Sequence, residues 1–464
     1  MITQMITLGI GILLMRLIEP EEFGLLGMVA VFTGFMNVIA NFGLTTSLIQ
    51  KKEVDELDKS TVFYVNLAIG VFLTMLLFFG STYIAKFYNT PELIPIAKYL
   101  SILFTTQAFG MIPSAMLRRE MNFRLMFFMN LFSSVIASSL AIYLALHDFG
   151  VWTLVYQQLT ASILTTLILL YIIRWYPKLI FSYNRLKQHM GFSLPLIGSK
   201  SLNYWGRNAD NLLIGKFLGS DALGIYSKAY ALMMLPLTKI SSVISSVMLS
   251  SFSLIQDDKE RIKTIYLKIS RVIAFITFPM MGILFVVAKP LVSFAFGDRW
   301  MDIVFIFKIL SLAGAIGSIV TLNGNIFISQ GKTTLMFKLN IIGSFITVMA
   351  FIIGVQFGIN AVAIAFLISV LIKLFPNLYF MGSIINLNIK EIFHNLRLHF
   401  IFTLMLTFLG VLSANYIKNL SNFLQVLFLS LEFITGWLLL IKFLSPSIFY
   451  EVKALFDEVK KKRK

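Results

Sequence analysis

The sequence predicts an all-α integral membrane protein with about fourteen transmembrane helices, in two six-helix parallel repeats followed by a C-terminal hairpin. Three observations lead to this fold class: the composition, the alternation of apolar runs with basic loops, and an internal repeat. Of the 464 residues, 58% are hydrophobic and 13% are charged, and the mean hydropathy is +0.85. A soluble domain carries roughly 25% charged residues. Lipid must therefore be the solvent for most of the chain.

The composition also excludes several kinds of chemistry. The chain has no cysteine, which rules out disulfides, thiol catalysis and cysteine-ligated metals. The net charge of +17 would suggest nucleic acid in a soluble protein. Here the basic residues lie mostly in short loops between apolar runs and suit anionic lipid headgroups instead. The histidines lie in loops or at span edges. We therefore expect membrane lipids as partners, and no nucleic acid, metal, cofactor or catalytic residue.

Long apolar runs place the spans along the chain. The first of them is short for a span, which needs about 20 residues, so we expect a chain that begins inside its first helix. The fourteen runs lie near residues 2–15, 24–48, 60–85, 91–116, 125–146, 149–173, 191–217, 222–252, 264–288, 300–328, 333–354, 358–382, 397–417 and 422–444. They predict an N-terminal six-helix lobe over 1–175, a C-terminal six-helix lobe over 190–382, an additional hairpin over 393–444 and a basic cytoplasmic tail over 445–464.

Basic residues mark alternate loops. They are frequent after even-numbered spans and in the C-terminal tail, whereas the turns at 147–150, 219–222 and 355–358 contain no Lys or Arg. Lys289 and Arg299 are the main exceptions. Positively charged residues favour the cytoplasmic side of a membrane. We therefore expect a multi-pass protein of the bacterial cytoplasmic membrane with both termini in the cytoplasm.

The two halves of the chain resemble each other weakly. Residues 18–25, IEPEEFGL, align with residues 218–225, LGSDALGI, and two later pairs of segments keep nearly the same separation. Chance similarity among apolar helices is the alternative, but the common order and the near-constant separation argue against it. Each repeat holds an even number of spans, so both enter the membrane from the same side. Parallel repeats of this kind predict a substrate path between the two halves.

Two segments resemble a known family. Residues 16–24, RLIEPEEFG, resemble the end of the first helix in polysaccharide flippases of the multidrug/oligosaccharidyl-lipid/polysaccharide superfamily. Residues 208–219, NADNLLIGKFLG, with the LGIY segment at 223–226 and Ala229, resemble the seventh-helix signature of that family. The resemblance to the colanic-acid and O-antigen exporter branch covers nearly the whole chain. It implies two lobes around a central cavity and export of an undecaprenyl-diphosphate-linked oligosaccharide. The first helix departs from the family, where it is usually longer and follows basic residues.

Ionisable residues inside the predicted spans are mostly basic. An ionisable group in hydrocarbon costs roughly 2.5 kcal/mol or more, so each one needs a partner, a cavity or a function. Asp210 and Glu432 are the acids well inside a span. A path lined by an excess of cations would attract a diphosphate. Cations near span ends can instead snorkel to the headgroups. The intramembrane cations are Lys98, Lys200, Arg207, Lys216, Lys228, Lys239, Lys268, Arg271, Lys308, Lys338 and Lys373.

The predicted seventh span carries the most polar intramembrane stretch. Lys200, Asn203, Arg207 and Asp210 recur at three- and four-residue spacing, which places them along one helical face. Arg207 lies on the order of 15 Å below the outer end of the span, too deep to snorkel easily. Its planar guanidinium can grip a phosphate with two donors, which a lysine cannot. Asp210 is the candidate for binding a coupling ion, H⁺ or Na⁺, and a structural ion pair with Arg207 is the alternative. The predicted substrate-binding residues are Arg207, Lys200, Asn203, Lys239 and Lys308.

The function predicted from these features is a flippase that moves a lipid-linked oligosaccharide across the cytoplasmic membrane by alternating access. Its expected partners are the lipid-linked cargo, membrane lipids and a coupling ion. The first alternative is another cargo on the same scaffold, either a peptidoglycan lipid precursor or a cationic drug. The second is a membrane glycosyltransferase or polymerase. Such enzymes normally need catalytic carboxylates or a sizeable extracytoplasmic loop, and this sequence offers neither. The prediction is therefore a transporter without enzymatic activity.

Overall fold

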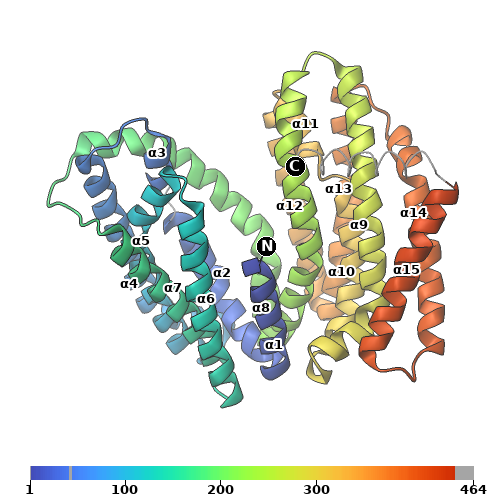
Figure 1. Ribbon diagram of the computed structural model, residues 1–464, viewed down its shortest axis with the longest axis horizontal. Coiled ribbons are helices and arrows are strands. Elements are labelled where there is room, and N and C mark those ends of the chain that lie inside the picture. Colours follow the sequence, from blue (N-terminus) through green and yellow to red (C-terminus); the bar gives the residue numbers. More distant parts are fainter. Residues whose placement is uncertain (1, 41–43, 445–464) are drawn as a thin grey trace. The chain divides into compact units, whose positions relative to one another are not determined.

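The computed structural model describes residues 2–40 and 44–444, and every regular element within these ranges is a helix (Figure 1). The first part of the chain forms α1 (Ile2–Leu17), α2 (Pro20–Ala40), α3 (Leu44–Gln50), α4 (Glu56–Tyr88), α5 (Leu93–Arg119), α6 (Phe123–Leu146) and α7 (Val151–Ile173). The remainder forms α8 (Tyr183–Leu254), α9 (Lys259–Ala295), η1 (Asp298–Trp300), α10 (Ile303–Ser318), α11 (Asn323–Ser329), α12 (Thr333–Gly354), η2 (Val355–Phe357), α13 (Ile359–Ile384), α14 (Ile389–Tyr416) and α15 (Asn422–Leu444).

The helices match the predicted spans closely. Among the described residues, 11 helical stretches are long and apolar enough to cross a membrane. They coincide with the second to sixth and the ninth to fourteenth predicted spans. The first predicted span corresponds to α1, whose apolar part, Leu8–Leu17, is shorter. The seventh and eighth predicted spans both lie in α8. The all-α membrane fold predicted from the sequence is thus confirmed.

Helix α8 is two helices joined at Gly219. The backbone of Gly219 is non-helical, with φ 87° and ψ −175°, a left-handed conformation that glycine adopts at little cost. Gly215 and Leu223 are four residues before and after this point. A Cβ atom on Gly215 would lie only 3.2 Å from Leu223 Cδ2, so the chain turns back on itself around Gly219. The predicted seventh and eighth spans are therefore the two arms of an elbow.

Polar side chains fix the starts of two helices. The Asp55 side chain accepts a hydrogen bond from the backbone N–H of Asp58, and the Asp58 side chain accepts one from the Asp55 N–H, which closes a capping box at α4. Asn388 and Glu391 form the same arrangement at α14. Each box satisfies backbone donors that the first turn of a helix leaves without partners. These two helices therefore begin where a polar loop residue meets an apolar run.

The chain divides into two compact units, Met1–Ser227 and Lys228–Lys464. In the first unit, α4, α5 and α7 pack together and α6 lies on α7. In the second unit, α9 contacts α10, α14 and α15, while α13 contacts α10 and α12. The unit boundary lies in the second arm of α8, whereas the lobes predicted from the repeat divide between residues 175 and 190. The two lobes stay a prediction, because they were defined by the sequence repeat and the compact units are defined by contacts within the structure.

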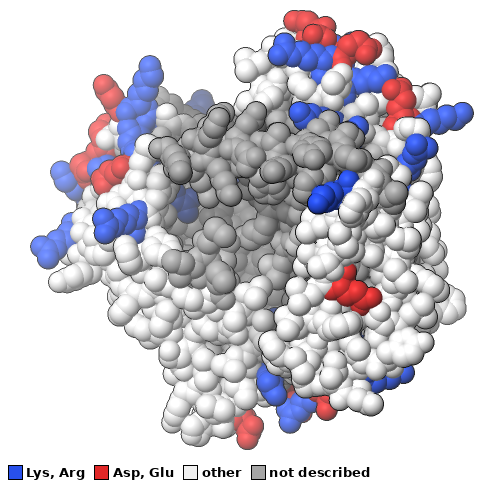
Figure 2. Space-filling view, turned by 45° about the vertical axis from the view of Figure 1, so that its right-hand side comes forward, with Lys and Arg blue, Asp and Glu red and all other residues white. Residues whose placement is uncertain are grey.

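Charged side chains gather near the ends of the helices (Figure 2). Between these ends, the visible surface that is described is almost free of charge. Large apolar side chains cover it: Phe79 on α4 is 72% exposed and Phe345 on α12 is 66% exposed. A soluble protein rarely leaves such extended apolar surface in water. The exposed apolar band is the part of each unit that faces lipid.

Candidate substrate-binding and coupling site

Lys200 and Arg207 lie on the first arm of α8, the part that precedes Gly219. The side chains of Lys200 and Arg207 are exposed. The backbone of Asn203 and Lys239 is helical, but the side chains of both lie outside the described part of the structure. The assignment of these residues to a substrate therefore stays a prediction.

Asp210, one turn after Arg207, is buried. Its side chain is 5% exposed, and its carboxylate accepts a hydrogen bond of 2.8 Å from the backbone N–H of Asn211. The side chain of Tyr226, on the second arm of α8, lies near the same carboxylate. The ion pairs formed by the described residues do not include one between Arg207 and Asp210. Asp210 is thus buried one helical turn away from the exposed Arg207.

Helix α2 packs along the first arm of α8. The Tyr204 hydroxyl donates a hydrogen bond of 2.7 Å to the carbonyl oxygen of Val31. Gly34 leaves room for this ring, since a Cβ on Gly34 would overlap it. Phe35 adds contacts with the Tyr204 and Trp205 rings, at centroid distances of 6.0 and 5.1 Å. These contacts hold the arm that carries Arg207 and Asp210 in a fixed register against α2.

A reciprocal glycine seam, formed by Pro20, Gly24, Ser220 and Gly224, closes the contact between α2 and the elbow. A Cβ on Gly24 would overlap the carbonyl oxygen of Ser220, and a Cβ on Gly224 would overlap the carbonyl oxygen of Pro20. In the aligned repeat, residue 20 corresponds to 220 and residue 24 to 224. Equivalent residues therefore contact one another in exchanged pairs, as a two-fold relation requires. The seam supports a repeat that the sequence shows only weakly.

Glu22, next to this seam, caps a neighbouring helix. Its carboxylate accepts a hydrogen bond of 2.7 Å from the backbone N–H of Val151, the first residue of α7. A negative charge at a helix N-terminus is favourable because it meets unpaired N–H donors and the positive end of the helix dipole. Ala222 occupies the equivalent position in the second repeat and cannot make this bond. The first repeat is therefore tied together by a contact that the second lacks.

The start of α4 anchors the segment that leads from α7 into α8. Trp175 Nε1 donates a hydrogen bond of 3.0 Å to Glu56 Oε2. Arg185 pairs with Asp55 at 3.1 Å and lies 3.7 Å from Asp58, which is buried. Because this connection links the two sequence repeats, its anchorage fixes the point from which α8 departs.

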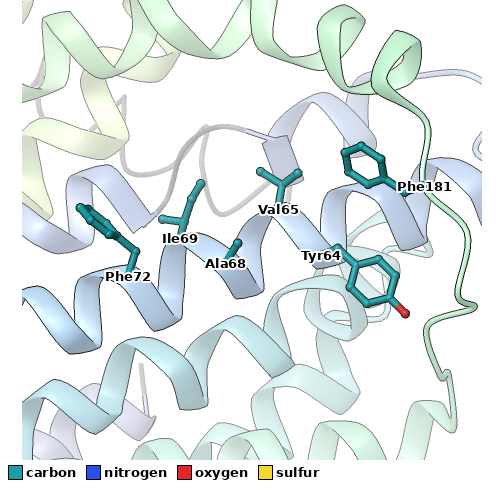
Figure 3. Close-up of a pocket in the computed structure, with 6 residues that line it drawn as sticks. All are labelled: Tyr64, Val65, Ala68, Ile69, Phe72 and Phe181. Carbon is teal, nitrogen blue, oxygen red and sulfur yellow. The ribbon is translucent and has the colours of Figure 1, made fainter.

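An apolar groove runs along α4 near its start (Figure 3). It has a volume of about 430 Å³ and no Lys, Arg, Asp or Glu in its lining. Such a groove suits a hydrocarbon chain and has no cation for a diphosphate. Its lining residues are Tyr64, Val65, Ala68, Ile69 and Phe72 of α4 and Phe181 of the segment after α7.

Lys308 belongs to the second unit. It is half-buried on α10, and its Nζ lies 5.4 Å from the centroid of the Phe285 ring. An ammonium over an aromatic face is attracted by the ring quadrupole, so this contact partly compensates the charge. The described residues contain no group of three or more His, Cys, Asp or Glu placed to hold a metal ion.

Sequence reasoning missed Tyr204, Tyr226 and Glu22. Each makes its contact with a residue far along the chain or across the α8 elbow, and periodicity within one helix cannot show such partners. The glycine seam did leave a signal. Gly24 and Gly224 occupy the same position in both repeats, and a glycine repeated in this way indicates a close backbone approach.

The chain is similar to bacterial polysaccharide biosynthesis proteins over most of its length. It is 28% identical over 375 residues to the lipopolysaccharide biosynthesis protein WzxC of Escherichia coli (strain K12), covering 79% of this chain and 76% of that protein. It is 27% identical over 410 residues to the teichuronic acid biosynthesis protein TuaB of Bacillus subtilis (strain 168), covering 85% of each.

Among solved structures, the lipid II flippase MurJ in its inward closed conformation shares the fold. Its TM-score is 0.75 at 17% identity, covering 97% of this chain and 98% of that one. The sequence model of the polysaccharide biosynthesis protein family matches residues 13–305, which is more than half of the chain. The sequence resemblance, the helical fold and this match agree, and the chain is a multi-pass membrane protein that belongs to the polysaccharide biosynthesis protein family.

Proposed function

We propose that this protein is a flippase that translocates an undecaprenyl-diphosphate-linked oligosaccharide across the bacterial cytoplasmic membrane for surface polysaccharide biosynthesis, by alternating access. The family match over residues 13–305 carries the proposal. The names of WzxC and TuaB, which refer to lipopolysaccharide and teichuronic acid biosynthesis, support a cargo of this class. The fold shared with MurJ supports a transporter rather than an enzyme.

The residue chemistry fits this cargo. Arg207 is exposed on the first arm of α8, where a guanidinium can bind a diphosphate with two donors. Lys200, which precedes Arg207 by about two helical turns on the same face, is exposed as well. We assign Arg207 and Lys200, with Asn203, Lys239 and Lys308, to the cargo headgroup. Asp210 is assigned to the coupling ion, because its buried carboxylate has neutral hydrogen-bond partners.

Two other cargoes are the alternatives on the same scaffold. A cationic drug would favour carboxylates along its path, and the intramembrane charges of this chain are mainly basic. A peptidoglycan lipid precursor carries the same diphosphate, and the fold likeness to MurJ does not separate it from a polysaccharide repeat unit. The relatives' names favour the polysaccharide cargo.

Deleting the gene tests this assignment. We expect surface polysaccharide to be lost and its lipid-linked repeat unit to accumulate on the cytoplasmic leaflet, because synthesis continues while translocation stops. Mass spectrometry of the lipid extract measures the accumulation. A plasmid copy of the wild-type gene is the control and should restore export. Normal surface polysaccharide in a deletion strain without a second flippase would reject the proposal.

The membrane orientation gives a second test. We expect both termini in the cytoplasm, because basic loops follow the even-numbered spans. A fluorescent reporter that folds only in the cytoplasm, fused after Lys464, should therefore fluoresce. A fusion after Asp148, in the turn between α6 and α7, is the matched control and should stay dark. An alkaline-phosphatase-active fusion at the C-terminus would contradict this orientation.

A further inference from the structure

Lys373 lies near the middle of α13 and is half-buried. It is 14 residues after Ile359 and 11 before Ile384, the two ends of α13. At 1.5 Å per residue these separations are about 21 and 16 Å. A lysine stem of four methylenes reaches roughly 6 Å, so snorkelling does not bring its ammonium to either end. A charge at this depth is costly and marks a functional position by default.

The ammonium of Lys373 is held by a neutral hydroxyl. Its Nζ donates a hydrogen bond of 2.6 Å to Thr347 Oγ1 on α12. The Thr347 hydroxyl donates its own proton to the carbonyl oxygen of Gly343, at 2.9 Å. A Cβ on Gly343 would lie 3.2 Å from Lys373 Cδ, so this glycine makes room for the lysine stem. The contacts define a narrow slot between α12 and α13.

Charge compensation does not come from nearby acids. Lys373 takes no part in the ion pairs that the described residues form. Helices α10, α11, α12 and α14 pack on α13, and the Tyr230 ring of α8 lies 5.8 Å from the Phe366 ring of α13. The described ionisable groups of α13, of these four helices and of α8 from Lys228 onward, apart from Lys373, are Lys228, Tyr230, Lys308, Lys338, Tyr379, Lys390, Glu391, His394, Arg397, His399 and Tyr416. Glu391 is the one carboxylate of this set, and it pairs with Lys263 at 2.8 Å.

We propose that Lys373 binds the coupling proton, a role that rests on the proposed function and restricts the assignment of Asp210 to a coupling Na⁺. In the charged form, the ammonium donates to Thr347. On release, one N–H bond breaks, the nitrogen keeps the electron pair and the proton passes to water on the side to which the site opens. The resulting neutral amine can then accept the Thr347 proton. The exchange removes the cost of a charge inside the membrane. Lys373 and Thr347 stay hydrogen-bonded to each other in both states.

The geometry favours a proton over an anionic headgroup. The slot is tight, with Gly343 against the stem and Thr347 buried. A diphosphate needs several donors and the space to approach them, whereas a proton needs a single lone pair. Thr347 is a positioning residue here, since it orients the amine and carries no titrating group of its own.

The test uses wild-type and variant proteins reconstituted in vesicles of phosphatidylethanolamine and phosphatidylglycerol. The probe is the lipid-linked oligosaccharide extracted from the deletion strain, and translocation is followed with and without a gradient of one pH unit. One proton per cargo should shift the steady-state ratio of the probe between the two leaflets by roughly tenfold in the wild type over such a gradient. Lys373→Met should lose this dependence, because it has no titrating group. Lys373→Arg should fail to respond as well, since arginine does not release its proton.

Two further variants keep the result interpretable. Thr347→Val should shift the pH profile of transport while retaining a gradient response, as expected of a positioning residue. Lys338→Met is the matched control, because Lys338 is an exposed lysine of α12 and should behave like wild type. Abundance and melting temperature of each variant correct for folding.

The outcomes separate the alternatives. Full activity in Lys373→Arg with loss in Lys373→Met would show an anion-binding role and overturn the proton site. A wild-type gradient response in Lys373→Met would overturn it as well. In either case the wild type still translocates the probe and the proposed function stands. Failure of the wild-type protein to translocate the probe would instead reject the proposed function.

Discussion

Replacing Arg207 with alanine is expected to reduce export per molecule by roughly thirtyfold or more, because truncating one partner of a charged contact costs about 2 kcal/mol or more. Arg207 is exposed on the first arm of α8, so the cargo can reach it. Arg207→Lys should also impair export, though less, since it keeps the charge and loses the two-pronged grip. Surface polysaccharide divided by the amount of membrane-inserted protein gives export per molecule.

Asp210→Asn distinguishes binding from structural support. Asp210 is buried and accepts a hydrogen bond from the neutral backbone N–H of Asn211, so its replacement should affect coupling or folding without removing the Arg207 contact. We expect Arg207→Ala to leave protein abundance unchanged. If both variants lowered abundance while export per molecule stayed normal, Arg207 would be a structural residue and its assignment to the cargo would be wrong.

Gly24→Ala and Gly224→Ala should each lower the free energy of unfolding by about 1–3 kcal/mol, the usual cost of overpacking. In both cases the new Cβ would overlap a backbone carbonyl oxygen, which cannot rotate away as a side chain can. The two carbonyls belong to Ser220 and Pro20, on opposite sides of the reciprocal glycine seam. Thermal unfolding of the purified protein in detergent, followed by tryptophan fluorescence, measures the effect.

Gly80→Ala is the matched control for the seam. Gly80 lies inside α4, and a Cβ there would meet no heavy atom within 4 Å. Alanine is favoured over glycine inside a helix by about 1 kcal/mol, so this variant should be neutral or more stable. The double seam variant should lose less than the sum of the single losses, because both changes open one contact. Equal stability of Gly24→Ala and Gly80→Ala would refute the seam.

The sequence predicts the helices well because lipid imposes a strict length on apolar runs. It predicts two spans on either side of Gly219, and α8 indeed turns there. The tenth predicted span, near 300–328, is interrupted between Ser318 and Asn323, which separates α10 from α11. No proline or charge marks this break in the sequence. Side chains of other helices surround it, as Tyr266 donates a 2.8 Å hydrogen bond to Asn323 Oδ1.

The functional residues are harder to predict than the helices. In a membrane protein, lipid-facing and core-facing sides of a helix are both apolar, so periodicity does not reveal which side meets protein. The sequence places Arg207 and Asp210 on one face, yet one is exposed and the other buried. Lys373 stands out in the sequence as a deep charge, but its partner Thr347 comes from a separate helix.

The measurement that tests the central claim most directly is translocation by the purified protein. Vesicles of phosphatidylethanolamine and phosphatidylglycerol are loaded with the lipid-linked oligosaccharide from the deletion strain, and a membrane-impermeant glycosidase is added outside. In protein-free vesicles only the outer-leaflet sugar should be cleaved. With the wild-type protein, sugar from both leaflets should become accessible to the glycosidase. Arg207→Ala should slow the cleavage of the sugar that starts on the inner leaflet. An inner-leaflet pool that stays protected in the presence of folded wild-type protein would contradict the account.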